Sequence, residues 1–205
     1  FPVVGRYATH YDVSKVTQLG FRFLIGCLIV LPFALRQGAV RLSAPHWAGF
    51  AAMGGMYVVQ SIFYLMSTDR IPIGMTSILL YLYPAVVAVL SRIFLGERLT
   101  RRKVLALALA SAGAVLTIGA PGAVTDMTGA WMALVTPTVY SVYIIVGAKL
   151  QRDVPALVSS AAIMGSAAAL AFGLGALAAL FAPESSVLAL RFDLPAQAWL
   201  ALFAF

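Results

Sequence analysis

The chain has 205 residues, of which 62% are hydrophobic and 10% are charged, and its formal net charge is +7. Soluble domains carry about 25% charged residues, so this composition excludes an ordinary soluble protein and indicates an integral membrane protein. The basic residues flank apolar segments, which is typical of membrane orientation, so we expect no nucleic-acid partner.

The apolar segments predict an all-α membrane bundle. In chain order, helices are expected at residues 17–35, 46–66, 73–95, 102–118, 129–148 and 155–181, with the end of an earlier helix at 1–8 and the start of a later one near 196. Most of these lengths are close to the about 20 residues that cross a bilayer core. The segment 73–95 is almost unbroken by polar residues, and the basic cluster Arg101-Arg102-Lys103 follows it.

The ends of the chain and its reactive residues are also informative. The chain begins with Phe1, no signal peptide precedes the first apolar segment, and the final apolar segment at 199–205 stops abruptly. We therefore expect a piece of a longer protein.

Cys27 is the single cysteine, and neither His10 nor His46 has a Cys or an acidic residue at metal-binding spacing. No metal ion or cofactor is expected.

Charge is distributed unequally between the two sides that alternating spans would create. One side holds two acidic residues, Glu97 and Asp153, and nine basic residues: Arg36, Arg41, Arg92, Arg98, Arg101, Arg102, Lys103, Lys149 and Arg152. The other side holds five basic and five acidic residues. Because basic loops stay in the cytoplasm, we expect loops 36–46, 92–103 and 149–153 to be cytoplasmic in a multi-pass protein of the plasma or inner membrane.

A weak internal repeat divides the chain. Val3-Val4-Gly5 is similar to Ile145-Val146-Gly147, and the helix start at Trp47 is similar to that at Trp199. The repeats would cover residues 1–120, lacking most of a first helix, and 128–205, which is truncated. A unit of five helices places its copy upside down in the membrane, as in many secondary transporters. Chance similarity is the alternative, because few residues match.

Several motifs resemble the EamA branch of the drug/metabolite transporter superfamily. They are Gly54, Gln60 and Tyr64; Ile73-Gly74-Met75-Thr76-Ser77; Leu82-Tyr83-Pro84; Leu95-Gly96-Glu97-Arg98-Leu99-Thr100; and Ala112-Gly113-Ala114. Leu19-Gly20-Phe21-Arg22-Phe23 is similar to the start of the family's second helix. The resemblance implies ten helices in two inverted halves. Tyr64-Leu65-Met66-Ser67 departs from the family's small residue followed by Leu, so no subfamily is assigned.

Polar and aromatic residues within the spans are the candidate substrate-binding residues. They are Tyr57, Gln60 and Tyr64 on one helical face, Ser77 and Tyr81 on the next span, Trp131 and Ser141 on a later one, and Arg22. Such groups can line a pocket for a small molecule. The alternatives are hydrogen bonding between helices, interfacial anchoring and, for Arg22, extension of the side chain to the membrane surface.

Two prolines and a small-residue pattern concern helix geometry. Pro84 and Pro137 each lie in the middle of a span and are candidate hinges beside the substrate path; a packing kink is the alternative. Gly165, Ala169 and Gly173 repeat every four residues, so we expect them to form a close-packing stripe.

Together these features predict a secondary transporter, an exporter of small organic metabolites such as amino acids or related zwitterionic or anionic compounds. Binding would occur at the midplane, with alternating access. Its partners would be the substrate, the lipid bilayer and, optionally, a second copy in a homodimer. A membrane-embedded enzyme is the first alternative, but no paired His, Asp or Ser with a base lies at depth, so no enzymatic activity is expected. A non-transporting membrane scaffold is the second.

Overall fold

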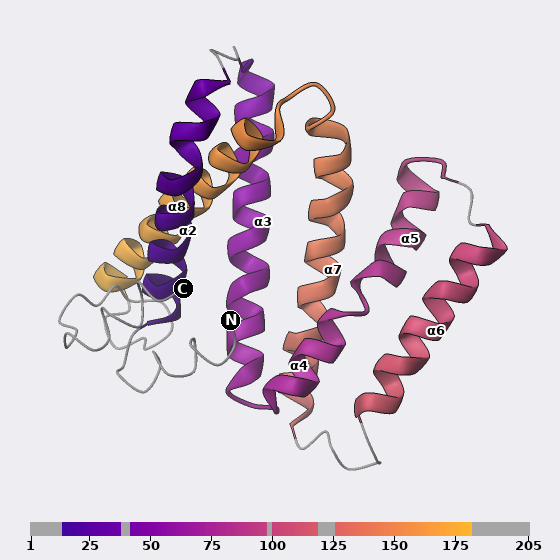
Figure 1. The fold of residues 1–205 in the computed structure, drawn as a ribbon. Helices are drawn as coiled ribbons and strands as arrows, with labels where there is room; N and C mark the ends of the chain where they lie inside the picture. Colours follow the sequence, from indigo (N-terminus) through magenta and orange to yellow (C-terminus); the bar gives the residue numbers. More distant parts are fainter. Residues whose placement is uncertain (1–13, 38–41, 98–99, 119–125, 182–205) are drawn as a thin grey trace. The chain divides into compact units, whose positions relative to one another are not determined.

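The protein is seen in a computed structural model that describes residues 14–37, 42–97, 100–118 and 126–181. Within these ranges it is helical, without strands, which confirms the all-α prediction. The helices are α2 (Lys15–Arg36), α3 (Ala44–Thr68), α4 (Ile73–Leu80), α5 (Tyr83–Phe94), α6 (Arg101–Ile118), α7 (Met127–Leu150) and α8 (Ala156–Phe181) (Figure 1). The sequence-expected helices at 1–8 and near 196 lie outside the described residues.

Five spans in the described ranges are long and apolar enough to cross a membrane. They are α2, α3, the consecutive α4 and α5 taken together, α7 and α8. Helix α6 is not among them, because three of its 18 residues, Arg101, Arg102 and Lys103, are basic. The structure therefore supports a multi-pass membrane bundle.

The expected single helix at 73–95 is in fact two helices, and this is a correction to the prediction. Pro84 has no N–H, so the Leu80 carbonyl loses the donor that a continuous helix would supply. Helix α4 ends with the Leu82 N–H donating to the Leu79 carbonyl at 3.2 Å, and α5 begins with the Ala85 N–H donating to the Leu82 carbonyl at 3.1 Å. The prediction placed a bend at Pro84, whereas the break lies just before it.

The end of α5 follows from one glycine. Gly96 has φ of 67°, a left-handed conformation that a residue with a Cβ adopts only with strain. This turn lets the Glu97 N–H donate to the Ser91 carbonyl at 3.2 Å, so the helix stops and the chain reverses toward α6.

The chain forms two compact units. The first consists of residues 1–58 and 150–205, and the second of residues 59–149. Helix α3 contributes its first part to one unit and its last part to the other. These units are defined by contacts between residues, whereas the repeats at 1–120 and 128–205 were predicted from sequence similarity. The units therefore do not test the repeats, which stay a prediction.

Small residues hold the first unit together. Helices α2 and α8 pack closely: Gly20 faces the Phe172 ring, and the Cys27 thiol lies 3.5 Å from the Ala161 carbonyl. Helix α3 approaches α8 at Gly54, where an added Cβ would lie 2.8 Å from the Ala167 backbone nitrogen. The helices can therefore touch backbone to backbone, which drives association inside a membrane.

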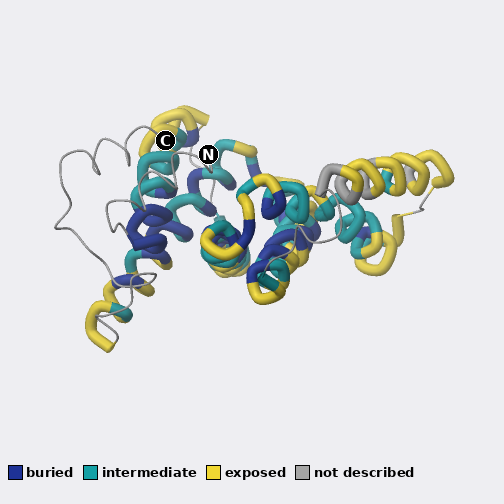
Figure 2. Tube along the Cα trace, turned by 90° about the horizontal axis from the view of Figure 1, so that it is seen from below, coloured by how far each residue is buried: buried dark blue, intermediate teal, exposed yellow. Residues whose placement is uncertain are grey.

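The packing face of α8 is not the predicted stripe. Ala169 is exposed, and a Cβ added to Gly173 would meet nothing within 4 Å. The buried small residues of α8 are instead Ser159, Ala161, Ala167, Ala168, Ala171 and Gly175. Only Gly165 of the predicted set makes a close approach, 3.4 Å from its Cβ position to the Cys27 sulfur. Buried and exposed residues alternate along the helical trace, as expected for helices that bury one face (Figure 2).

The second unit is held by an apolar core and an ion pair. Ile71, Met75 and Ala133 are buried together, with Leu79 packed against them, and α4 and α5 contact α6. At the start of α7, Asp126 accepts hydrogen bonds from the backbone N–H groups of Thr128 and Gly129 and pairs with Arg70 at 2.9 Å. The hydrogen bond from Arg70, with these backbone bonds, lowers the pKa of Asp126 below its ordinary value.

The contact at Gly54 gives a test of the first unit. Gly54→Ala should lower the free energy of unfolding by about 1–3 kcal/mol, because the added methyl group meets α8 backbone that cannot rotate away. Gly173→Ala is the matched control and should be neutral or stabilising by up to about 1 kcal/mol, since helix propensity rises and nothing is displaced. Thermal unfolding in detergent would measure both, and equal effects would contradict the packing.

Candidate functional site

Two of the three residues predicted to share a polar face of α3, Gln60 and Tyr64, belong to the second unit. Gln60 and Tyr64 are buried, with 8% of each side chain exposed, and lie one turn apart. The Tyr64 hydroxyl lies 3.0 Å from the Ser77 hydroxyl of α4. Two of the predicted residues on different helices are thereby brought into direct contact.

A threonine of α7 meets the same part of α3. Thr136 is 1% exposed, and its hydroxyl lies 3.5 Å from the Gln60 carbonyl and 3.4 Å from the Met132 carbonyl of its own helix. The hydroxyl has one proton, so it donates to one carbonyl at a time. The backbone of Gln60 in α3 thus lies close to Thr136 of α7.

Ser141 connects α7 to the break between α4 and α5. Its hydroxyl lies 2.6 Å from the Pro137 carbonyl and 3.2 Å from the Tyr83 carbonyl, and it is fully buried. Beside this contact the Tyr83 and Tyr140 rings meet edge to face, with centroids 5.1 Å apart, and the Tyr140 and Tyr143 rings stack at 5.7 Å. The region combines a helix break, a bonded hydroxyl and three partly buried tyrosines.

Arg22 and Tyr57 belong to the first unit and are linked through one ring. The Arg22 guanidinium lies 6.0 Å from the centroid of the Phe23 ring, and the Phe23 and Tyr57 rings meet edge to face at 5.3 Å. Phe23 is buried, whereas Arg22 and Tyr57 are half-buried. The face of an aromatic ring attracts a cation, which helps to hold Arg22 within an apolar span.

Two predicted residues are not brought to these groups. The Tyr81 side chain is 67% exposed and the Trp131 side chain is 65% exposed. Tyr81 directly follows α4, and its N–H still donates to the Ser77 carbonyl at 3.2 Å, so it lies on the exposed face of that helix just before the break. Its role, like that of the other candidate residues, stays a prediction.

The two candidate hinges differ in their surroundings. Pro84 stands in the first turn of α5, directly after the break. Pro137 is fully buried inside α7, which continues through it from Met127 to Leu150. Only Pro84 therefore lies at an interruption of the helix.

Thr136 and Tyr83 also belong to this region, although neither is among the residues predicted from the sequence. Thr136 stands four residues before Tyr140, and Pro137 four before Ser141, so one face of α7 carries them all. That spacing was the available signal. Tyr83 contributes its carbonyl, which a pattern of side chains does not reveal. Among the described residues, no group of three or more His, Cys, Asp or Glu side chains could hold a metal ion.

Comparison with known proteins establishes the family. The model of the EamA-like transporter family matches residues 1–119, more than half of the chain. The chain belongs to the EamA-like transporter family. The family is part of the drug/metabolite transporter superfamily, so the protein is a transporter-family membrane protein whose environment is lipid and whose substrate class is small molecules.

Solved structures show the same fold. One, described as "Crystal structure of protein", is 22% identical, with a TM-score of 0.69 over 98% of this chain and 72% of that one. At this identity the likeness shows the fold alone. No curated protein matches the chain.

The contact between Tyr64 and Ser77 gives a test of what this hydrogen bond contributes to stability. Tyr64→Phe and Ser77→Ala should each lower the free energy of unfolding of this EamA protein by about 1 kcal/mol, and the double variant by no more than either, since each loses the same hydrogen bond. Tyr81→Phe, at an exposed position, should stay within about 0.5 kcal/mol. Additive effects of the two substitutions in thermal unfolding would contradict the bond.

Proposed function

We propose that the protein is a secondary transporter that exports small zwitterionic or anionic organic metabolites, such as amino acids. Membership of the EamA-like transporter family supports transport. The finer substrate class rests on the charges within the spans. Binding near the middle of the membrane would alternate between the two sides as two inverted repeats, residues 1–120 and 128–205, rock against each other.

The observation that carries this substrate class is the sign of the buried charge. None of the described helices α2 to α8 contains an Asp or a Glu. The half-buried Arg22 lies seven residues into α2, beside Phe23 and Tyr57. A guanidinium at depth is costly and is retained where it meets an anion, and it offers a carboxylate two parallel hydrogen bonds.

Arg22 therefore gives the direct test. Arg22→Gln should raise KM for an anionic or zwitterionic substrate by about 10- to 100-fold, the loss of one hydrogen bond to a charged group. The measurement is transport in proteoliposomes with amino acids and quaternary ammonium dyes as competing substrates. Arg92→Gln is the control, since Arg92 is exposed on α5 and should leave KM unchanged.

Selective transport of the quaternary ammonium dyes by the natural chain would overturn the proposed substrate class. Equal effects of Arg22→Gln and Arg92→Gln would overturn the role of Arg22. A circular-dichroism spectrum of each variant in detergent would show whether it retains its helices.

We also propose that loops 36–46, 92–103 and 149–153 face the cytoplasm, in the plasma or inner membrane. The unequal distribution of basic residues supports this orientation. The boundaries of the helices support it too, because Arg36 ends α2, Arg101 begins α6 and Lys149 is in the last turn of α7.

The orientation can be tested with single cysteines in a Cys27→Ser background. A cysteine replacing Asp69, between α3 and α4, should react with a membrane-impermeant maleimide in intact cells. A cysteine replacing Arg152, between α7 and α8, should react only after the membrane is permeabilised. The Cys27→Ser parent should stay unlabelled. The reverse labelling pattern would contradict the proposed sidedness.

A further inference from the structure

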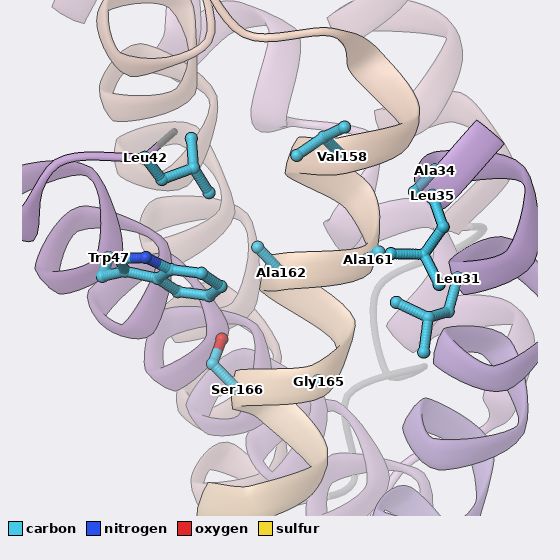
Figure 3. A pocket seen from close by; sticks show the side chains of 10 residues that line it. All are labelled: Leu31, Ala34, Leu35, Leu42, Trp47, Val158, Ala161, Ala162, Gly165 and Ser166. Carbon is cyan, nitrogen blue, oxygen red and sulfur yellow. The ribbon is translucent and has the colours of Figure 1, made fainter. Parts of the chain in front are cut away.

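The first unit contains a pocket that the proposed transport site does not use. Its volume is about 460 Å³, within the range of about 300–1,000 Å³ that small-molecule sites occupy. Trp47 and Leu42 stand on one side, side chains of α2 on the other, and α8 lies between them (Figure 3). The lining residues are Leu31, Ala34, Leu35, Leu42, Trp47, Val158, Ala161, Ala162, Gly165 and Ser166.

The chemistry of the pocket does not suit a charged metabolite. Eight of the ten lining residues have purely hydrocarbon side chains or none, and none is charged. The Ser166 hydroxyl lies 3.1 Å from the Phe50 carbonyl and 2.9 Å from the Ile163 carbonyl, so its proton is already used. An amino acid would lose its hydration here without gaining a charged partner, whereas a hydrocarbon chain would bury apolar surface.

The position of the pocket along the helices indicates what kind of hydrocarbon chain it would bind. It lies where α2 ends and where α3 and α8 begin, which is one end of three membrane-crossing helices. Arg36 follows the lining residue Leu35 and is exposed. Trp47, whose side chain is 56% exposed, is the residue type that marks the boundary of hydrocarbon and headgroups. An apolar pocket lined by Leu35, with the exposed Arg36 next to it in the chain at the end of α2, complements an acyl chain joined to an anionic headgroup.

We propose that this pocket binds one acyl chain of an anionic phospholipid, with its phosphate at the Arg36 guanidinium. The chain fills the space between Trp47 and Leu31, over the small residues of α8. A bound lipid would fill this pocket and would contact α2, α3 and α8 of the first unit together. This site is distinct from the proposed metabolite site and does not depend on the substrate.

The experiment uses Trp47 as its reporter. Trp131→Phe and Trp199→Phe leave Trp47 as the sole tryptophan of the full chain. The protein is reconstituted in nanodiscs of phosphatidylcholine, with increasing fractions of phosphatidylglycerol whose acyl chains carry bromine, a quencher of tryptophan fluorescence. Brominated phosphatidylcholine in the same fractions is the lipid control. Saturable quenching at a lower fraction of the anionic lipid is expected.

Two variants assign that quenching to the pocket. Ala162→Phe fills the pocket and should reduce quenching to the level given by phosphatidylcholine; Ala169→Phe, at an exposed position of the same helix, should not. Arg36→Gln should raise the fraction of anionic lipid needed for half-quenching about fivefold, the contribution of one basic residue at the membrane surface. Arg36 lies outside the pocket, so this variant still tests the proposal if Ala162→Phe does not fold.

Equal quenching by both lipids, unchanged by Ala162→Phe, would mean bulk lipid contact only and would overturn the proposal. Protection of Trp47 by a transported metabolite in place of lipid would also overturn it, by assigning the pocket to the substrate. Absence of transport by the natural chain, with lipid binding present, would instead contradict the proposed function alone.

Discussion

A polypeptide in lipid must satisfy its backbone hydrogen bonds from within the protein, since each unpaired group there costs several kcal/mol. The second unit shows how this constraint shapes a transporter-family bundle. Pro84 denies the Leu80 carbonyl its helical donor, and the span divides into α4 and α5. The Ser141 hydroxyl of α7 lies 2.6 Å from the Pro137 carbonyl of its own helix and 3.2 Å from the Tyr83 carbonyl, so α7 packs closely against the start of α5. The break thus follows from the missing N–H of Pro84, and a buried hydroxyl of the neighbouring helix lies beside it.

The existence of the helices was readable from the sequence, because a span needs a long apolar segment and the loops between spans carry turn residues and charge. Helices α3 and α8 begin and end within about two residues of their expected bounds. The division at Tyr81 and Leu82 was less readable. A proline in a span predicts the loss of one backbone hydrogen bond. It does not by itself fix the residue at which the helix ends, because that also depends on contacts with neighbouring helices.

The faces of the helices were the least predictable feature. In water, apolar residues mark the buried side, but lipid is as apolar as a protein core, so an apolar residue can face either. Helix α8 is rich in alanine and glycine, and many sets of small residues repeat every four positions along it. The predicted set at Gly165, Ala169 and Gly173 largely faces away from the close contacts. By contrast, buried hydroxyls such as Tyr64 identified real contacts, because a polar group in a span needs a partner.

The small residues that allow close packing also explain where the first unit is hollow. At Gly20, near the start of α2, the absence of a side chain lets the Phe172 ring of α8 fill the space between the helices. Near the other end of α2, Ala161, Ala162 and Gly165 of α8 again leave room, but the bulky residues that face them, Leu31 and Trp47, lie at the sides of the space (Figure 3). Where a large ring inserts beside small residues, as at Gly20, the helices are in contact. Where no large side chain inserts, as at Ala162, a pocket remains. In the lipid site that we propose, an acyl chain fills this space in the way that the Phe172 ring fills the space at Gly20.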